Sequence, residues 1–243
     1  MQLEFKFKKS VLPLLLGTLM PCMAMAESFG SLGSLSQDQF KQLSENLSAA
    51  IHYKGLGPAE PLGILGFDVG IVVSSTALDE ELFDDASDGD FEAPELIIPR
   101  IHVNKGLPFG VDIGASYSEI PDTDISLMAA ELRYALLEGS TVSPAVGIRA
   151  SHARLEGLSD MEMNSSALEL TASKGFVMFT PYAGVGIVRT KVTPEGLANL
   201  TSETYDQKKI YVGLTINLGV ALTLEADKTD DFRTYSVKAG IRF

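Results

Sequence analysis

The sequence predicts an all-β protein: a closed antiparallel transmembrane β-barrel of about ten strands, preceded by one short N-terminal amphipathic helix. Three observations predict this fold. Apolar and polar residues alternate along most of residues 62–243, as in strands with one apolar and one polar face. Short and long connections alternate between these segments, which is typical of membrane-spanning barrels. Finally, the chain opens with an export signal, and no later apolar run is as long as a membrane helix.

Residues 1–26 have the pattern of a secretory signal peptide. Lys6, Lys8 and Lys9 form a positive start, and residues 11–20 form an apolar core that is too short to span a bilayer as a helix. The residues Ala-Met-Ala at 24–26 form a small-x-small cleavage site. The mature protein is therefore expected to begin at residue 27 and to act outside the cytoplasm.

Cleavage after Ala26 would remove Cys22, the only cysteine, so the mature chain is expected to have no disulfide and no thiol ligand. A lipoprotein anchored at Cys22 is the less favoured alternative, because Pro21 is a poor match to the small residue that lipid attachment prefers. The signal segment carries one acid and three lysines, which leaves 31 acidic and 16 basic residues and a net charge of −15. This charge excludes a general nucleic-acid binder. The sequence predicts no cofactor.

Residues 27–61 are expected to form an N-terminal lead that holds the one convincing helix, at about 36–54. Ser36 and Gln39 match a capping box. Apolar residues then recur at helical spacing; they are Phe40, Leu43, Leu47, Ala50 and Ile51. Two positions stay open for this helix. It rests on the membrane surface or at the barrel mouth, which is the favoured interpretation, or it forms a small plug inside the barrel.

Ten segments with a period of two follow, in residues 62–243. They start near residues 63, 96, 108, 124, 142, 162, 177, 208, 219 and 232. The alternation is weakest in the second and the sixth segment. Backbone groups cannot stay unpaired in lipid, so the strands are expected to close on themselves.

The polar face of these segments carries six acids, five bases and one histidine, which we call the lumen charge network. Its members are Asp68, Arg100, His102, Asp112, Glu131, Arg133, Arg149, Glu169, Glu225, Asp227, Lys238 and Arg242. A ten-stranded barrel is narrow, so opposite charges inside it are expected to pair. In particular, the antiparallel register places Glu131 close to Arg149.

Nine inward positions are glycine, which leaves room for the arginines of the network to reach across the lumen. Two outcomes follow. If the ion pairs close the lumen, the protein has a structural or surface-interaction role, and the small barrel size favours this interpretation. If a gap remains, the protein is a narrow channel for ions or small solutes.

An acidic stretch, residues 79–95, is a candidate calcium loop. Asp84, Asp88, Glu92 and Glu95 fall at ligand positions of a calcium-loop pattern, but Ala86 supplies no ligand. A solvated loop that is kept extended by its own charge repulsion is the favoured interpretation.

A histidine beside a serine is the single hint of catalysis. His152 follows Ser151, and Asp160 lies across the next connection. The alternation of the strand points Ser151 inward and His152 toward lipid, so the two side chains are not expected to pair. An enzyme that acts on lipid or peptide is therefore the least favoured alternative, and no catalytic residue is predicted.

The chain ends on an alternating strand whose apolar face is Tyr235, Val237, Ala239, Ile241 and Phe243. This ending resembles the C-terminal insertion signal of Gram-negative outer-membrane β-barrel proteins, and the resemblance covers residues 62–243. It implies recognition by the barrel insertion machinery, location in the outer membrane, and contact with its lipid and lipopolysaccharide.

The alternating connection lengths and the even number of strands set the expected orientation. The short turns are expected in the periplasm together with both ends of the barrel, residues 27–61 and their helix, and residues 79–95 are expected outside. A monomer is expected. The resemblance does not identify a physiological role.

Overall fold

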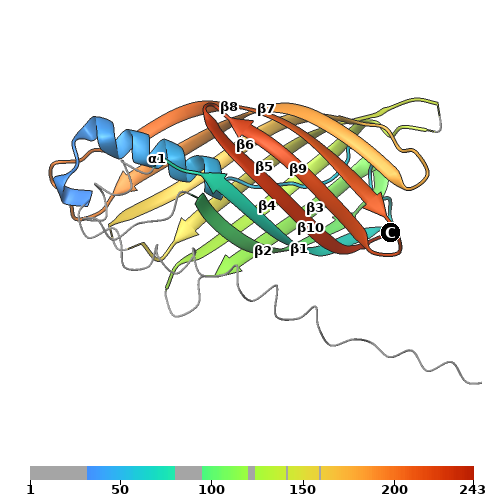
Figure 1. Cartoon of the computed structure of the whole chain (residues 1–243), viewed down its shortest axis with the longest axis horizontal. Coiled ribbons are helices and arrows are strands. Elements are labelled where there is room, and N and C mark those ends of the chain that lie inside the picture. The colour runs from blue at the N-terminus through green and yellow to red at the C-terminus, as the bar shows by residue number, and fades with distance from the viewer. Residues whose placement is uncertain (1–31, 80–94, 120–123, 141, 159) are drawn as a thin grey trace, which may run out of the picture.

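The computed structural model describes residues 32–79, 95–119, 124–140, 142–158 and 160–243. Ten antiparallel strands form a closed barrel, in which each strand pairs with its neighbours in sequence and β1 pairs with β10 (Figure 1). The predicted fold class is thus confirmed. The strands are β1 (Phe67–Ala77), β2 (Glu95–Gly106), β3 (Val111–Glu119), β4 (Ser126–Leu137), β5 (Ala145–Glu156), β6 (Met161–Ser173), β7 (Phe179–Pro194), β8 (Glu203–Asn217), β9 (Ala221–Thr229) and β10 (Phe232–Arg242).

Within the described ranges, the helices are α1 (Gln37–Ile51) and two single 3₁₀ turns, η3 (Leu32–Ser34) and η4 (Pro108–Gly110). In the part of the chain that the structure describes, no helix is both long and apolar enough to cross a membrane.

The alternation of apolar and polar residues in the sequence gives the barrel an apolar outer surface and a polar interior. On β1, Val69, Ile71 and Val73 are exposed, whereas the residues that alternate with them are buried; these are Asp68, Gly70, Val72 and Ser74. Almost all of the remaining strands show the same division into an exposed apolar face and a buried polar face. A continuous apolar outer surface of this kind suits a hydrocarbon environment.

The two ends of the barrel differ. The end that holds Phe243 and the β2–β3, β4–β5, β6–β7 and β8–β9 connections is called the turn end, and the opposite end is called the loop end. The predicted strict alternation of short and long connections is wrong. At the loop end, β9 and β10 are joined by Asp230 and Asp231 alone, whereas residues 138–144 at the turn end form a seven-residue connection. Length alone therefore does not distinguish the two ends.

Helix α1 begins where the sequence predicts. Ser36 is its N-cap, and the capping box is formed: the backbone N–H of Gln39 donates to Ser36 Oγ, and Ser36 N–H donates to Gln39 Oε1 at 3.0 Å. The helix ends at Ile51, and His52 follows in an extended conformation.

The favoured interpretation of this helix, on the membrane surface or at the barrel mouth, is wrong, and the plug alternative is right. Phe40, Leu43 and Leu47 are fully buried against inward side chains of the strands. The amphipathic pattern therefore reports an apolar wall inside the barrel and not a lipid surface. The helix also lies at the loop end and not, as expected, at the end that holds the short turns and Phe243 (Figure 1).

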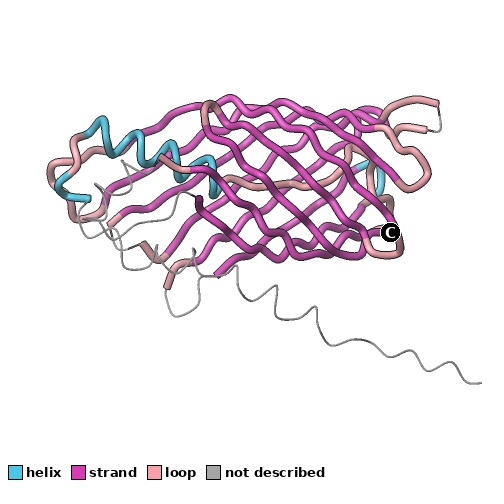
Figure 2. The backbone as a smooth tube through the Cα atoms, in the orientation of Figure 1, coloured by secondary structure: helices cyan, strands magenta, loops and turns pink. Residues whose placement is uncertain are grey.

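The chain then runs through the lumen to the turn end, where β1 starts (Figure 2). We call residues 53–66 the thread. This stretch contains no helix or strand, and Tyr53, Lys54 and Leu56 in it are fully buried. The interior is thus filled by the N-terminal segment along most of its length.

The interior has two zones. At the loop end, α1 packs in an apolar core that the strands supply from inward positions; these include Leu96, Ile98, Leu127, Leu155, Met163 and Val192. Toward the turn end, the inward residues are mostly polar, many of them are charged, and they surround the thread. The helix, whose backbone is satisfied internally, occupies the apolar zone. The thread, whose backbone is not, occupies the charged zone.

The barrel closes where its last residue meets its first strand. Phe67 and Phe243 exchange two backbone hydrogen bonds, at 2.7 and 3.0 Å, and their rings pack edge to face with centroids 3.8 Å apart. Phe243 therefore belongs to the closing seam as well as to the predicted insertion signal.

We expect Phe243→Asp to slow assembly of the barrel, because a carboxylate would replace the ring that packs on Phe67 at the closing seam, on the apolar outer surface. The fraction of heat-modifiable, membrane-inserted protein after synthesis would measure this. Phe109→Asp is the control, since Phe109 is 91% exposed at the turn end. Its φ of 66° is one that aspartate tolerates better. Equal assembly rates for the two variants would contradict the role of Phe243.

Candidate functional site

The residues of the predicted lumen charge network all lie inside the barrel. Eleven of the twelve are buried, and Arg242, near the turn end, keeps 12% of its side chain exposed. Each sits at an inward position of its strand, as the alternation requires. The structure shows how these charges are arranged and what they contact.

One chain of ion pairs runs around the wall from β3 to β6. Arg133 Nη2 lies 2.6 Å from Asp112 Oδ2, and Arg149 Nη1 lies 3.1 Å from Glu169 Oε2. The predicted pair of Glu131 with Arg149 is confirmed: Arg149 Nε lies 2.7 Å from Glu131 Oε2, although these two atoms do not meet in hydrogen-bonding geometry. Opposite charges therefore lie next to one another across four neighbouring strands.

Two further groups complete the network. On the other side of the lumen, Lys238 Nζ and Arg242 Nη1 lie 2.8 and 3.3 Å from the same oxygen of Asp68. Nearer the loop end, Lys54 of the thread reaches Asp227 at 3.0 Å, and both side chains are fully buried. The thread thus supplies a counter-ion as well as a backbone.

The cations of the wall also bind the main chain of the N-terminal segment. Five of them donate to its carbonyl oxygens: Arg100 to Ala50 at 2.6 Å, Arg149 to Gly55 at 2.9 Å, Lys238 to Leu56 at 2.6 Å, Arg133 to Pro58 at 3.2 Å and Arg242 to Glu60 at 3.2 Å. We call these five contacts the carbonyl ladder. The arginines were expected to reach across the lumen, but Arg133, Arg149 and Arg242 instead bind a chain that runs through it.

Backbone N–H groups of the thread are bound as well. The N–H of Leu62 donates to Asp112 Oδ1 at 3.1 Å, and the N–H of Ala59 donates to Ser173 Oγ at 3.0 Å. Main-chain groups are strong hydrogen-bonding groups that must be satisfied when they are buried. The wall therefore provides partners of both kinds along the thread.

The close approach of the Arg149 guanidinium to the thread requires a glycine at position 55. A Cβ atom on Gly55 would overlap the guanidinium group of Arg149, whereas one on Gly57 would come no closer than 3.4 Å to Arg242 Nη1. The two glycines lie two residues apart in the same thread, and only Gly55 is needed for space.

Sequence reasoning missed several members of the site. Lys209 on β8 is fully buried, and its Nζ lies 2.8 Å from Glu169 Oε1. Tyr182 donates its hydroxyl to Glu225 Oε2 at 2.8 Å. Lys209 shares the inward parity of Tyr211, so the period of two in β8 could have identified it.

His102 does not join an ion pair. It is fully buried, its ring lies 5.3 Å from that of Tyr53 in a stacked arrangement, and neither ring nitrogen has a hydrogen-bond partner among the described residues. It packs on the thread as an aromatic side chain.

The serine and histidine of the catalytic alternative lie on opposite faces of β5. Ser151 is buried inside, and His152 is exposed outside, where its Nδ1 lies 2.9 Å from Ser166 Oγ. Ser151 and His152 are thus not brought together.

Three of the four calcium candidates, Asp84, Asp88 and Glu92, lie outside the described residues. Glu95 is described and accepts a hydrogen bond from the hydroxyl of Ser75. Among the described residues, no cluster of histidine and carboxylate side chains could hold a metal ion.

Comparison with known proteins finds similarity in architecture. No protein-family model matches the chain, and no curated protein matches it either. Among solved structures, the N-terminal β-barrel domain of Pseudomonas aeruginosa OprF matches with 11% identity and a TM-score of 0.36, over 72% of this chain and 97% of that domain. Ail, the attachment invasion locus protein of Yersinia pestis, matches with 14% identity and a TM-score of 0.33, over 73% and 98%.

The KdgM porin, in complex with disordered oligogalacturonate, matches with 10% identity and a TM-score of 0.36, over 73% of this chain and 99% of that one. Similarity at this level concerns the barrel alone and carries no argument about function.

We expect Glu131→Gln to lower the melting temperature of the barrel, because it leaves the Arg149 guanidinium with one carboxylate fewer inside the lumen. Removing one partner of a fully buried pair typically costs about 3–5 kcal/mol, and water in the lumen would reduce this. Glu131→Gln combined with Arg149→Gln is expected to recover part of the loss.

Thermal unfolding in detergent or lipid would measure both variants. Glu156→Gln is the control, because Glu156 pairs with Arg154 at 3.0 Å on the exposed outer face, where such pairs contribute little. An equal effect of Glu131→Gln and Glu156→Gln would contradict a dry, paired lumen.

Proposed function

We propose that this chain is an outer-membrane β-barrel whose lumen is closed by its own N-terminal segment, and that it serves a structural or surface-interaction role without conducting ions. The carbonyl ladder carries this proposal. It occupies the charged zone of the lumen, the one region whose polar lining would otherwise suit a hydrated pathway.

The energetics of the lumen support closure. Arg133, Arg149 and Lys238 each contact at least one wall carboxylate and also donate to one thread carbonyl. A guanidinium group has five N–H donors and an ammonium group has three. One carboxylate cannot accept hydrogen bonds from all of them, so the cation needs further acceptors. Withdrawal of the thread would remove these acceptors from groups that are buried, and each loss costs free energy.

We further propose that the turn end faces the periplasm, which places α1 and the loop end at the cell surface. Two observations support this orientation. Phe243 and its pairing with Phe67 lie at the turn end, as the resemblance to the C-terminal insertion signal requires, and the longest connection, residues 78–94, lies at the loop end. In this orientation residues 53–66 cross the membrane inside the barrel.

We expect the purified full-length protein to show no steady conductance in a planar bilayer, and Gly55→Ala to produce brief openings. The added methyl group would displace the Arg149 guanidinium and break its bond to the Gly55 carbonyl. Gly57→Ala is the matched control, because its methyl group fits.

Steady conductance of the unmodified protein would contradict closure and would favour a narrow channel. If both glycine variants stay silent while Gly55→Ala lowers thermal stability, the thread closes the lumen without depending on this contact. If neither variant differs from the unmodified protein in conductance or stability, the carbonyl ladder does not hold the thread.

We expect a cysteine at position 198 to react with a membrane-impermeant maleimide on intact cells, because Ala198 is exposed in the β7–β8 connection at the loop end. A cysteine at position 142 is the matched control. Val142 is 91% exposed at the turn end, so it is expected to react only after the outer membrane has been permeabilised. The reverse pattern would overturn the orientation.

A further inference from the structure

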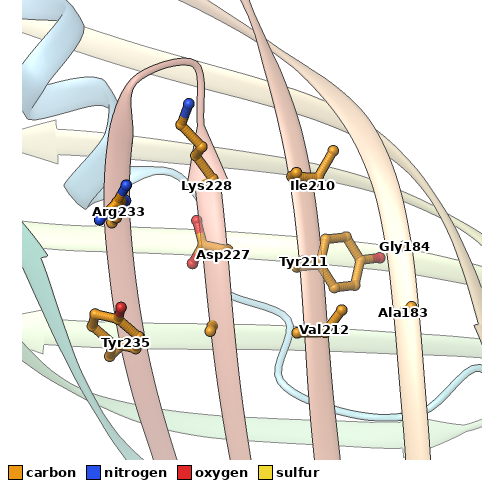
Figure 3. Close-up of a pocket in the computed structure, with 10 residues that line it drawn as sticks. Ala183, Gly184, Ile210, Tyr211, Val212, Asp227, Lys228, Arg233 and Tyr235 are labelled. Atoms are coloured by element: carbon orange, nitrogen blue, oxygen red, sulfur yellow. The ribbon is translucent and has the colours of Figure 1, made fainter.

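We propose that the outer wall of the barrel carries a binding site for a phosphorylated glycolipid of the lipid A type, in a groove on β7–β10 toward the loop end (Figure 3). This inference rests on the proposed orientation, which places the loop end in the outer leaflet. The site consists of an apolar groove and two cations beside it.

The groove arises from small residues between larger ones on the outer face. Ala226 on β9 lies opposite Tyr235 on β10 and opposite Val212 on β8. Val212 in turn lies opposite Ala183 on β7. Exposed Tyr235, Val212 and Ile210 therefore border a hollow over Ala226, with a volume of about 390 Å³ and a mostly apolar lining. Such a hollow on a lipid-facing wall fits an acyl chain.

Two cations lie at the loop-end side of this hollow. Lys228 and Arg233 lie opposite each other on β9 and β10 in the next outward row, and the side chain of Lys228 extends toward the β9–β10 connection (Figure 3). Like charges that lie directly opposite on one face of a sheet destabilise it. An anion that binds both would remove this repulsion.

Few groups of the protein compete for these cations. Among the described residues, Arg233 has neither an ion pair nor a hydrogen bond through its side chain. Lys228 approaches Asp231 at 3.4 Å, but Asp231 is 97% exposed at the tip of the connection, where such a pair is weak. Asp227 also lines the groove, but its carboxylate is turned into the lumen and paired with Lys54.

The arrangement of the apolar groove and the two cations indicates the chemical class of the ligand. An apolar groove that continues into a pair of cations at the membrane boundary matches an amphiphile with acyl chains and a phosphate. The guanidinium group of Arg233 can bind two phosphate oxygens side by side. The chain carries a net charge of −13, so its general field repels anions, and binding must depend on this local pair. In the outer leaflet of a Gram-negative outer membrane, the lipid of this chemistry is lipid A.

The test is binding of purified lipid A, with both phosphates, to the full-length barrel in nanodiscs of uncharged lipid. The variant Lys228→Ala/Arg233→Ala is expected to bind lipid A at least about tenfold more weakly, since charge-assisted bonds to phosphate are lost. Ala226→Leu, which fills the groove and leaves the charges in place, is expected to weaken binding as well. Dephosphorylated lipid A is expected to bind the unmodified barrel as weakly as lipid A binds the double variant.

Lys191→Ala is the matched control, because Lys191 lies outward near the loop end of β7 but does not line the groove. Three outcomes would overturn the proposal: unchanged binding by the double variant, an equal loss with Lys191→Ala, or equally tight binding of phosphatidylglycerol. Binding in nanodiscs does not depend on orientation in the cell. If the maleimide labelling is reversed but lipid A still binds in a groove-dependent way, only the proposed orientation is overturned. If the labelling is as expected but lipid A does not bind, only the proposed site is overturned.

Discussion

The structure depends on one constraint: cations that are enclosed in the lumen need hydrogen-bond acceptors for their donors. A wall carboxylate satisfies only part of a guanidinium or ammonium group. The main chain of the thread supplies further acceptors, so that Arg149, for example, contacts Glu131, Glu169 and the Gly55 carbonyl at once. The glycine at position 55 and the extended path of the thread both follow from this requirement.

The same constraint explains why the lumen has two zones. A helix pairs its own backbone groups, so α1 needs only an apolar surface and lies against Leu96 and Ile98 of β2. The thread has unpaired carbonyls and needs donors. The cationic donors begin on the same face of the same strand with Arg100, which binds the Ala50 carbonyl in the last turn of α1, just before the thread. One strand therefore changes from apolar to charged inward residues where the N-terminal segment changes from helix to thread.

The sequence predicted what depends on local periodicity. The inward position of the charged residues, the capping box at Ser36 and the Glu131–Arg149 pair all follow from a period or a register. The plug does not, because its partners lie far away in the chain. A signal was nevertheless present: the second and sixth segments alternate weakly because Leu96, Ile98 and Met163 are apolar residues at inward positions. An apolar inward patch in a barrel requires an apolar occupant, and the amphipathic helix at 37–51 was available.

The two parts of the plug are held by different physical means, and this difference determines how the lumen could open. Burial of apolar side chains holds α1, whereas main-chain hydrogen bonds hold the thread. The thread is tethered at both ends, by α1 and by the covalent link to β1. When a single rung of the carbonyl ladder breaks, the freed segment stays at a high effective concentration next to its partners and binds again. Lasting opening would require α1 to leave its apolar core, which costs far more than one hydrogen bond because several large side chains would be exposed together. The apolar anchor at the loop end, rather than the ladder it positions, therefore sets the barrier between a closed barrel and a channel.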